Sequence, residues 1–302
     1  MKLHRDWSTP GFELEPSAPA VGPFPLRSYL QTWWTHRNHE VDDLIIAEDH
    51  DGLAVFVRSA KGIEFAGESD LTDYHSPLGQ HGPRVVADYL SSLDAGTAFT
   101  LDSLPIEASE PISEALTASG IDHTKESHTV AAVMTLPSSF DEYLMMIGKK
   151  ERHETRRKRR RFTAALGDPT VQDRPEGLDV FIDMHRRASG DKGSFMNEDM
   201  AGFFKALLED GDADLYLLYG SGHDAPVAGA FGWDGPSGYY LYNSAYDPEY
   251  QDVSPGVVML ASLIERAIDL GHERFDFLKG DETYKFRLGA SERELFVIEG
   301  QR

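Results

Sequence analysis

Short, mostly apolar runs occur in two groups along the chain, and each run predicts a β-strand. In both groups, turn-forming residues separate the three runs, which indicates an antiparallel meander. The first group lies in the first half of the sequence, at 43–48, 53–58 and 63–66. The second group lies in the second half, at 214–219, 227–233 and 239–246.

Apolar residues spaced three and four positions apart predict helices before and after each meander. In the first half these are 26–39, 83–93 and 111–119, with further strands at 98–101 and 129–135. In the second half they are 178–187, 197–209 and 255–270, with further strands at 274–278 and 295–298. Since the order of elements repeats, we expect a tandem duplication of one αβ unit.

The expected fold class is therefore α+β, with two tandem domains that each hold a mixed, mostly antiparallel sheet flanked by helices. We expect a first domain at 1–139, a basic connecting segment at 140–166 and a second domain at 167–302. A length of 302 residues suits two domains.

Composition narrows the class of protein. Hydrophobic residues make up 40% and charged residues 26% of the chain, as in soluble globular proteins. No apolar run is long enough to span a bilayer, and the first residues lack the apolar centre of a signal peptide, so we expect a cytoplasmic protein without membrane insertion. The absence of cysteine excludes disulfides and thiolate sites, and the scattered histidines indicate no metal site.

Charge is unevenly distributed. The net charge is −22, which argues against general binding to nucleic acids or anionic membranes. The segment KKERHETRRKRRR (149–161) holds nine basic and two acidic residues, and the rest of the chain has 49 acidic against 20 basic residues. On a helix, Lys149, Arg152, Arg156 and Arg160 fall roughly on one face. There are two alternatives for this face. It belongs to a solvated linker helix packed against the two acidic domains, or it binds a phosphorylated ligand.

A helix start follows the last strand of the second meander. Ser254 is placed to cap the helix, Pro255 suits its first turn, and Gly256 lets a ligand approach the backbone. Helix N-termini attract anions, so this is a candidate phosphate site; the alternative is an ordinary N-cap.

The strand predicted at 274–278 ends in a run of acids, a phenol and an amine, DFLKGDETYK (276–285). Loops after strand ends of αβ sheets often bind ligands. These side chains are either site residues or solvated loop residues.

Three motifs together resemble the CelD/FemAB-like branch of the GNAT acyltransferase superfamily: YDPEY (246–250), SPG (254–256) and FDFLKGDETYKFRLGA (275–290). The arginine-rich segment 149–162 is similar to a helix of that family. The resemblance covers about 140–295 and implies two tandem GNAT folds. It implies transfer of an acyl group to an amine, from acyl-CoA or, in the Fem branch, from aminoacyl-tRNA.

The resemblance also implies the positions of the donor site. The strand at 239–246, with Tyr242 and Tyr246, would line the pantetheine channel. The helix start would bind the pyrophosphate through Gln251, Ser254, Gly256 and Val257. The usual loop pattern Q/R-x-x-G-x-G/A is replaced here by QDVSPG (251–256).

For catalysis we expect Glu282 or Asp281 to act as base, and Tyr284 or Tyr246 to donate a proton. Lys285 would orient the substrate or stabilise negative charge. Arg152 and Arg156 would face a phosphate. His185 and Lys192 belong to a candidate substrate loop, which is otherwise a plain connection between helices.

We therefore predict an N-acyltransferase that uses acetyl-CoA or another acyl-CoA, without a metal. The acceptor would be an amine of a small molecule, amino sugar or peptide. The alternatives are an aminoacyl-tRNA-dependent transferase, in which case tRNA is the one nucleic-acid partner, or a non-catalytic module that binds a phosphorylated ligand. The sequence leaves the oligomeric state open.

Overall fold

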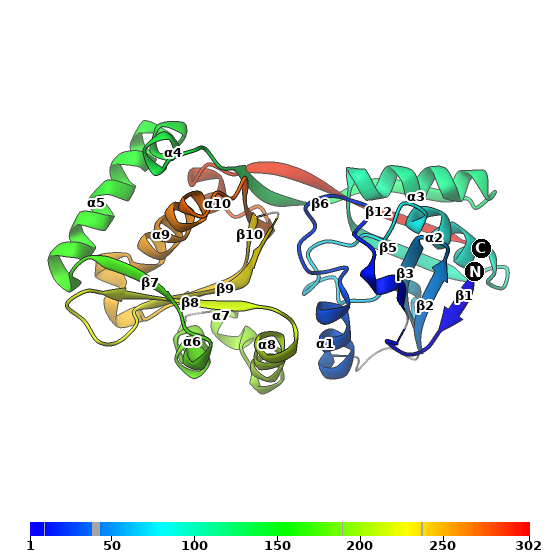
Figure 1. The fold of residues 1–302 in the computed structure, drawn as a ribbon, viewed down its shortest axis with the longest axis horizontal. Helices are drawn as coiled ribbons and strands as arrows, with labels where there is room; N and C mark the ends of the chain where they lie inside the picture. Colours follow the sequence, from blue (N-terminus) through cyan, green and yellow to red (C-terminus); the bar gives the residue numbers. More distant parts are fainter. Residues whose placement is uncertain (9, 38–42, 189, 237) are drawn as a thin grey trace. The chain divides into compact units, whose positions relative to one another are not determined.

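The computed structural model describes residues 1–8, 10–37, 43–188, 190–236 and 238–302 (Figure 1). Two compact units make up the chain. The first combines Met1–Ala131 with Arg293–Arg302, and the second is Ala132–Glu292. Each contains a mixed sheet with helices, which confirms the predicted fold class.

The sheet of the first unit takes one strand from the end of the chain. Its order is β1-β2-β3-β4-β5-β12, and only β4 and β5 pair in parallel. The strands are β1 (Lys2–His4), β2 (Asp43–Asp49), β3 (Gly52–Ser59), β4 (Gly62–Phe65), β5 (Ala98–Pro105) and β12 (Ser291–Gln301). The helices are η1 (Pro10–Glu13), α1 (Arg27–Arg37), α2 (Gly82–Ser91) and α3 (Ile106–Ala118).

The second unit repeats this succession. Its strand order is β6-β11-β10-β9-β8-β7, antiparallel from β7 to β10 and parallel between β10 and β11. The strands are β7 (Pro169–Asp173), β8 (Asp214–Gly220), β9 (Ala228–Gly235), β10 (Gly238–Tyr246), β11 (Arg274–Lys279) and the end of β6 (His123–Thr135). Residues 123–131 of β6 belong to the first unit and residues 132–135 to the second. A helix joins the parallel pair in both units, α2 in the first and α9 (Pro255–Asp269) in the second.

Helices cover both faces of the second sheet (Figure 1). One face carries α9 together with α4 (Phe140–Met146), α5 (Lys149–Leu166) and α10 (Thr283–Arg287). The other carries η2 (Pro175–Gly177), α6 (Leu178–Arg186), α7 (Asp191–Phe195) and α8 (Glu198–Asp210). The remaining turn, η3 (Pro248–Val253), leads from β10 into α9.

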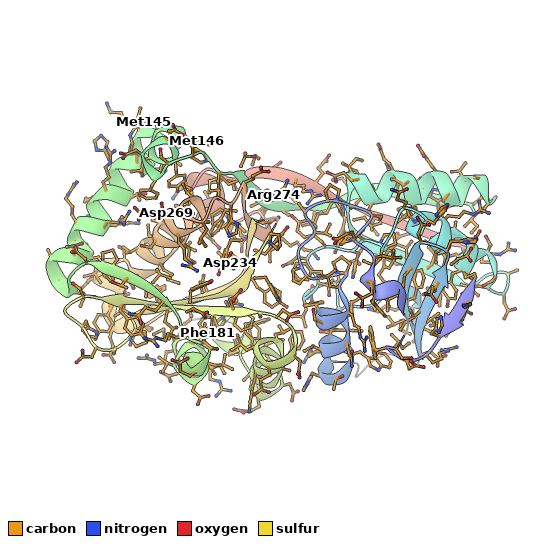
Figure 2. The ribbon with its side chains drawn as sticks, in the orientation of Figure 1. Met145, Met146, Phe181, Asp234, Asp269 and Arg274 are labelled. Carbon is orange, nitrogen blue, oxygen red and sulfur yellow. The ribbon has the colours of Figure 1, made fainter. Side chains whose placement is uncertain are left out.

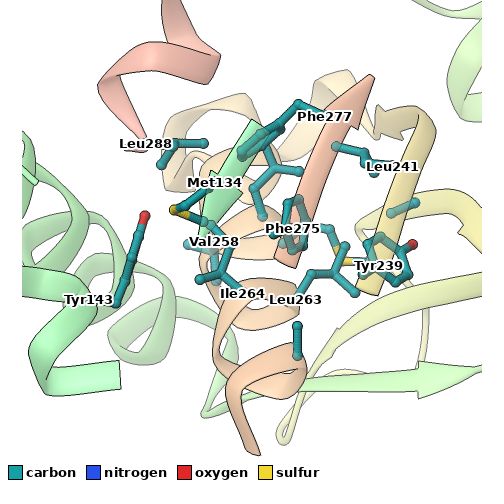
Figure 3. Packing of buried hydrophobic residues seen from close by; sticks show 14 of the residues in the cluster. Met134, Tyr143, Tyr239, Leu241, Val258, Leu263, Ile264, Phe275, Phe277 and Leu288 are labelled. Atoms are coloured by element: carbon teal, nitrogen blue, oxygen red, sulfur yellow. The ribbon is translucent and has the colours of Figure 1, made fainter. Parts of the chain in front are cut away.

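The core of the second unit is built around α9 (Figure 3). Val258, Leu263 and Ile264 of this helix pack against Phe275 and Phe277 of β11. All five are at most 2% exposed. Since apolar burial is the main stabilising contribution to folding, this contact holds α9 against β11.

Candidate functional site

The end of β10 is reoriented by a β-bulge. Its register against β9 shifts between Leu241 and Asn243. Because successive strand residues point to opposite faces, the extra residue moves the later even-numbered residues onto the α9 face. Ser244 and Tyr246 therefore lie on the same side as the start of α9, where both line a cavity.

The start of α9 corrects one prediction. Ser254 adopts a left-handed backbone with φ 55°, and its side chain makes no capping hydrogen bond, so the predicted side-chain cap is wrong. Its carbonyl instead accepts hydrogen bonds from the amides of Val257 (3.1 Å) and Val258 (3.2 Å). Pro255 occupies the first turn, as predicted. The Gly256 amide has no hydrogen-bond acceptor among the described residues, so it is available to a ligand.

Gly256 is needed for the shape of this site. A Cβ at this position would come within 3.3 Å of the Tyr246 ring, which is tighter than ordinary van der Waals contact. Glycine therefore lets the Tyr246 ring lie against the first turn of α9.

The inner face of α5 forms the opposite wall. Thr155 and Phe162 are buried, and Glu151, Thr155 and Lys158 follow one another at helical spacing on the same side. Arg159 forms an ion pair with Glu265 of α9 at 2.6 Å, and its guanidinium lies 5.0 Å from the centre of the Phe140 ring. These contacts hold α5 against α9.

Together these elements enclose a cavity of about 610 Å³. Five of the six predicted donor-site residues line it: Tyr246, Gln251, Ser254, Gly256 and Val257. Both candidate proton donors, Tyr246 and Tyr284, are in its lining, whereas Asp281, Glu282 and Lys285 are not. Pro255, which the sequence analysis placed in the same helix start, lines the cavity as well. The sequence analysis did not assign the other lining residues to a site; these are Lys150, Glu151, Glu154, Thr155, Lys158, Ser244, Leu260, Arg287 and Leu288.

The cavity has a cationic side. Lys150, Lys158 and Arg287 line it and make no ion pair with any residue that the structure describes. Of its two carboxylates, Glu154 is bound by Arg157 at 2.8 Å, and this hydrogen bond lowers the pKa of Glu154. Charge and the amide of Gly256 both favour an anionic group here.

The string 276–285 turns the chain sharply. Leu278 has a left-handed backbone with φ 60°, and its amide donates to the Asp276 carboxylate at 2.8 Å. The buried amine of Lys285 donates to the carbonyl of Lys279 at 2.7 Å and pairs with Glu282 at 2.8 Å. Lys285 therefore closes the turn, and it does not line the cavity.

This turn places α10 at the cavity, where Tyr284 forms part of the wall. Burial raises the pKa of the Tyr284 phenol to about 12, and the charge of Glu282 adds to the shift. The hydroxyl is therefore protonated at neutral pH. Asp281 and Glu282 are exposed and do not line the cavity.

The other predicted binding residues lie elsewhere. Tyr242 packs against Phe204 and Trp233, and Arg152 donates to the carbonyl of Leu144 at 3.2 Å. Arg156 is exposed on the outer side of α5.

His185 belongs to α6, on the face of the sheet away from α9, as the neighbouring Phe181 shows in Figure 2. It is buried, and its Nε2 lies 2.7 Å from Oδ1 of Asn243. The side chain of Lys192 lies outside the described residues.

Among the described residues, no three histidine or carboxylate side chains form a cluster that could hold a metal ion. A phosphorylated ligand fits the donor set of the cavity better. Phosphate binding needs a free backbone amide, positive charge and room for close approach. Gly256 supplies the amide and the room, and the three unpaired cations supply the charge.

Comparisons with known proteins identify a related family for the part of the chain that lines the cavity. Residues 149–286 match a family model described as an acetyltransferase (GNAT) domain. This range contains α5, β10, α9 and β11, so it covers every residue that lines the cavity except Arg287 and Leu288. No curated protein sequence matches the chain.

Solved structures share the fold at low sequence identity. A conserved protein of unknown function from Bacteroides thetaiotaomicron is 12% identical, with a TM-score of 0.67 over 97% of this chain and 95% of that one. FemX is 15% identical, with a TM-score of 0.66 over 98% and 97%. The C-terminal domain of a putative lysylphosphatidylglycerol synthetase from Agrobacterium fabrum is 10% identical, with a TM-score of 0.59 over 89% and 90%.

Proposed function

Because residues 149–286 match a GNAT acetyltransferase domain, we infer that the protein is an N-acyltransferase that moves an acyl group from acyl-CoA to an amine. The observation that carries this proposal is the cavity at the start of α9, with its available amide and unpaired cations. The amine would belong to a small molecule, an amino sugar or a peptide.

Donor binding would use both walls of the cavity. The amide of Gly256, at the positive end of the α9 dipole, would donate to the pyrophosphate. Lys158 and Arg287 would neutralise its charge from α5 and α10. Tyr246 and Ser244 would lie along the pantetheine arm, since the β-bulge turns both toward α9.

Catalysis would need a proton acceptor and a proton donor. The bound donor supplies a thioester, whose carbonyl carbon forms the new bond to the amine nitrogen as the carbon–sulfur bond breaks. Glu282 would take the proton of the amine, directly or through one water. The Tyr284 hydroxyl would give its proton to the leaving sulfur, because its raised pKa keeps it protonated until that charge develops.

Lys285 would act as a positioning residue. Its amine is 2.8 Å from the Glu282 carboxylate and is held by the Lys279 carbonyl, so it fixes the direction of Glu282. This replaces the expected direct contact between Lys285 and substrate.

Binding of the donor can be tested by calorimetry with acetyl-CoA, longer acyl-CoAs and free CoA. We expect Lys158→Gln and Arg287→Gln each to raise the Kd about tenfold, the usual effect of losing a charged hydrogen bond. Lys205→Gln is the matched control, because this residue lies on α8 over the opposite face of the sheet. Unchanged affinity in the first two variants would place the donor elsewhere.

Turnover is tested with Tyr284→Phe and Glu282→Gln. We expect kcat to fall about 100-fold or more while the Kd for acyl-CoA changes little, since each group takes part in proton transfer during the reaction and not in donor binding. Acyl-CoA binding without any turnover across a panel of amines would favour the non-catalytic binding module.

A second candidate is an aminoacyl-tRNA-dependent transferase of the Fem type. The nine basic residues of α5 and the fold shared with FemX favour it. Such an enzyme should retain tRNA with a steep salt dependence and should not bind acyl-CoA. If the protein instead uses acyl-CoA, this ligand at 100 times its Kd should raise the free energy of unfolding by about 2.7 kcal/mol.

A further inference from the structure

The side of α5 that faces away from the cavity is basic and exposed. We call it the outer face of α5; it consists of Lys149, His153, Arg156, Arg157, Arg160 and Arg161, all exposed. The spacing of 149, 153, 156 and 160 makes one continuous stripe, about 17 Å long at 1.5 Å per residue. Arg157 pairs with Glu154, and the other five make no ion pair with any described residue.

Two exposed methionines stand at the beginning of this face. Met145 and Met146 end α4, with 68% and 55% of their surface exposed (Figure 2). Arg152 ties them to α5, because its Nη1 donates to the carbonyl of Leu144 and lies 3.2 Å from Sδ of Met145. An apolar pair is thus fixed next to a row of cations.

We propose that the outer face of α5, with Met145 and Met146, docks the protein onto an anionic lipid bilayer. Basic side chains on the exposed side of a helix are attracted to anionic headgroups, and adjacent apolar side chains enter the headgroup region. The described residues contain no helix that is both long and apolar enough to cross the membrane, so the contact is peripheral.

Charge complementarity explains the orientation. The rest of the chain has 49 acidic against 20 basic residues, so an anionic surface repels the body as a whole and attracts α5. The inner face of the same helix lines the cavity, which stays clear of the lipid in this orientation.

A bilayer suits this face better than RNA does. Single-stranded RNA is usually bound by aromatic side chains that stack on bases, and the only aromatic ring of α5 other than that of His153 is Phe162, which is buried. Exposed methionines contribute nothing to phosphate binding, whereas their transfer from water into lipid is favourable. The proposal does not depend on which acyl donor the cavity takes.

The test is flotation of the full chain with vesicles of phosphatidylcholine alone or with about 30% phosphatidylglycerol, since the attraction requires anionic lipid. Binding should require the anionic lipid and weaken in about 0.5 M salt, where charges are screened. Arg156→Gln/Arg160→Gln/Arg161→Gln should lower the partition coefficient roughly 100-fold, at about fivefold per residue. Met145→Ser/Met146→Ser should lower it about tenfold through lost apolar burial.

The matched control removes three cations elsewhere, in Lys61→Gln/Arg84→Gln/Lys205→Gln, and should bind vesicles like the unmodified protein. Circular dichroism and thermal unfolding verify that each variant is folded. Two results would overturn the proposal. One is the absence of binding to anionic vesicles. The other is retention of bulk tRNA that the arginine variant loses and the methionine variant keeps, which would assign the outer face to RNA.

Discussion

Two residues with unusual backbone angles shape the candidate site. Ser254 and Leu278 both adopt left-handed conformations, which are costly for residues other than glycine. Each is held by specific hydrogen bonds: the Ser254 carbonyl accepts two amides of α9, and the Leu278 amide binds Asp276. These hydrogen bonds offset the conformational cost. The two bends set the direction of α9 and of α10, whose residues line the cavity.

Tyr143 offers a test of buried polarity in the core beside α9. Its hydroxyl is buried and has no hydrogen-bond partner among the described residues. Tyr143→Phe should therefore leave the free energy of unfolding at pH 7 unchanged or raise it by about 1 kcal/mol, because an unsatisfied group is removed. Urea denaturation measures this change.

The same variant has a predicted pH dependence. Burial raises the pKa of Tyr143 above its ordinary value of 10.0, so the folded state keeps a proton that the unfolded state loses. Stability from this group is complete below pH 10 and falls as the pH rises toward the folded pKa. The free energy of unfolding of Tyr143→Phe should fall less steeply above pH 10. Parallel slopes would contradict burial of this hydroxyl.

At the scale of elements, α5 works through two different faces. Its inner face follows Glu151, Thr155, Lys158 and Phe162, and Phe162 is fully buried. Phe162 is the only fully buried apolar residue of this basic helix, and it decides which side packs on α9, because burial of a ring outweighs the weak preferences of exposed charges.

Phe162→Ala should lower the free energy of unfolding by about 3 to 5 kcal/mol through lost burial and a cavity. Acyl-CoA binding should weaken too, because α5 forms one wall of the donor cavity. Phe162→Leu keeps most of the apolar volume and should retain most of the stability and affinity. Denaturation and calorimetry on the same samples separate the two effects. Wild-type stability in Phe162→Ala would show that α5 is not anchored by this residue.

At the scale of the whole molecule, the first unit depends on the end of the chain. β12 pairs with β5 from Leu295↔Pro105 to Gln301↔Ala98, and Leu295 and Ile298 are fully buried. Sequence analysis expected this strand in a second domain at 167–302. Pairing across nearly 200 positions leaves no signal in a local pattern.

A fragment of residues 1–131 should therefore fail to fold cooperatively, since an unpaired β5 exposes apolar side chains and an open sheet edge. The same fragment joined to 293–302 by a flexible glycine–serine linker should show a cooperative thermal transition in circular dichroism. Equal transitions in both fragments would mean that β12 is dispensable for this unit.

The sequence by itself determined the order and type of the main elements. Its motifs also indicated the resemblance to GNAT acyltransferases, and residues 149–286 match a GNAT acetyltransferase domain model. These features are local, since hydrophobic period and turn residues act over a few positions. It also indicated the helix start at 254–256 as part of the cavity, because Pro255 and Gly256 mark such a start directly. The spacing of Thr155 and Phe162, which places them on one side of a helix, could also have predicted the inner face of α5.

The tertiary structure alone decided which side chains meet. The sequence placed Lys285 beside substrate, but the left-handed turn at Leu278 brings its amine to backbone carbonyls and Glu282. It also gave no sign of Arg287 in the cavity or of β12 in the first unit. These contacts join segments that are far apart in the chain. They depend on burial and charge in the packed structure, so a local sequence pattern does not reveal them.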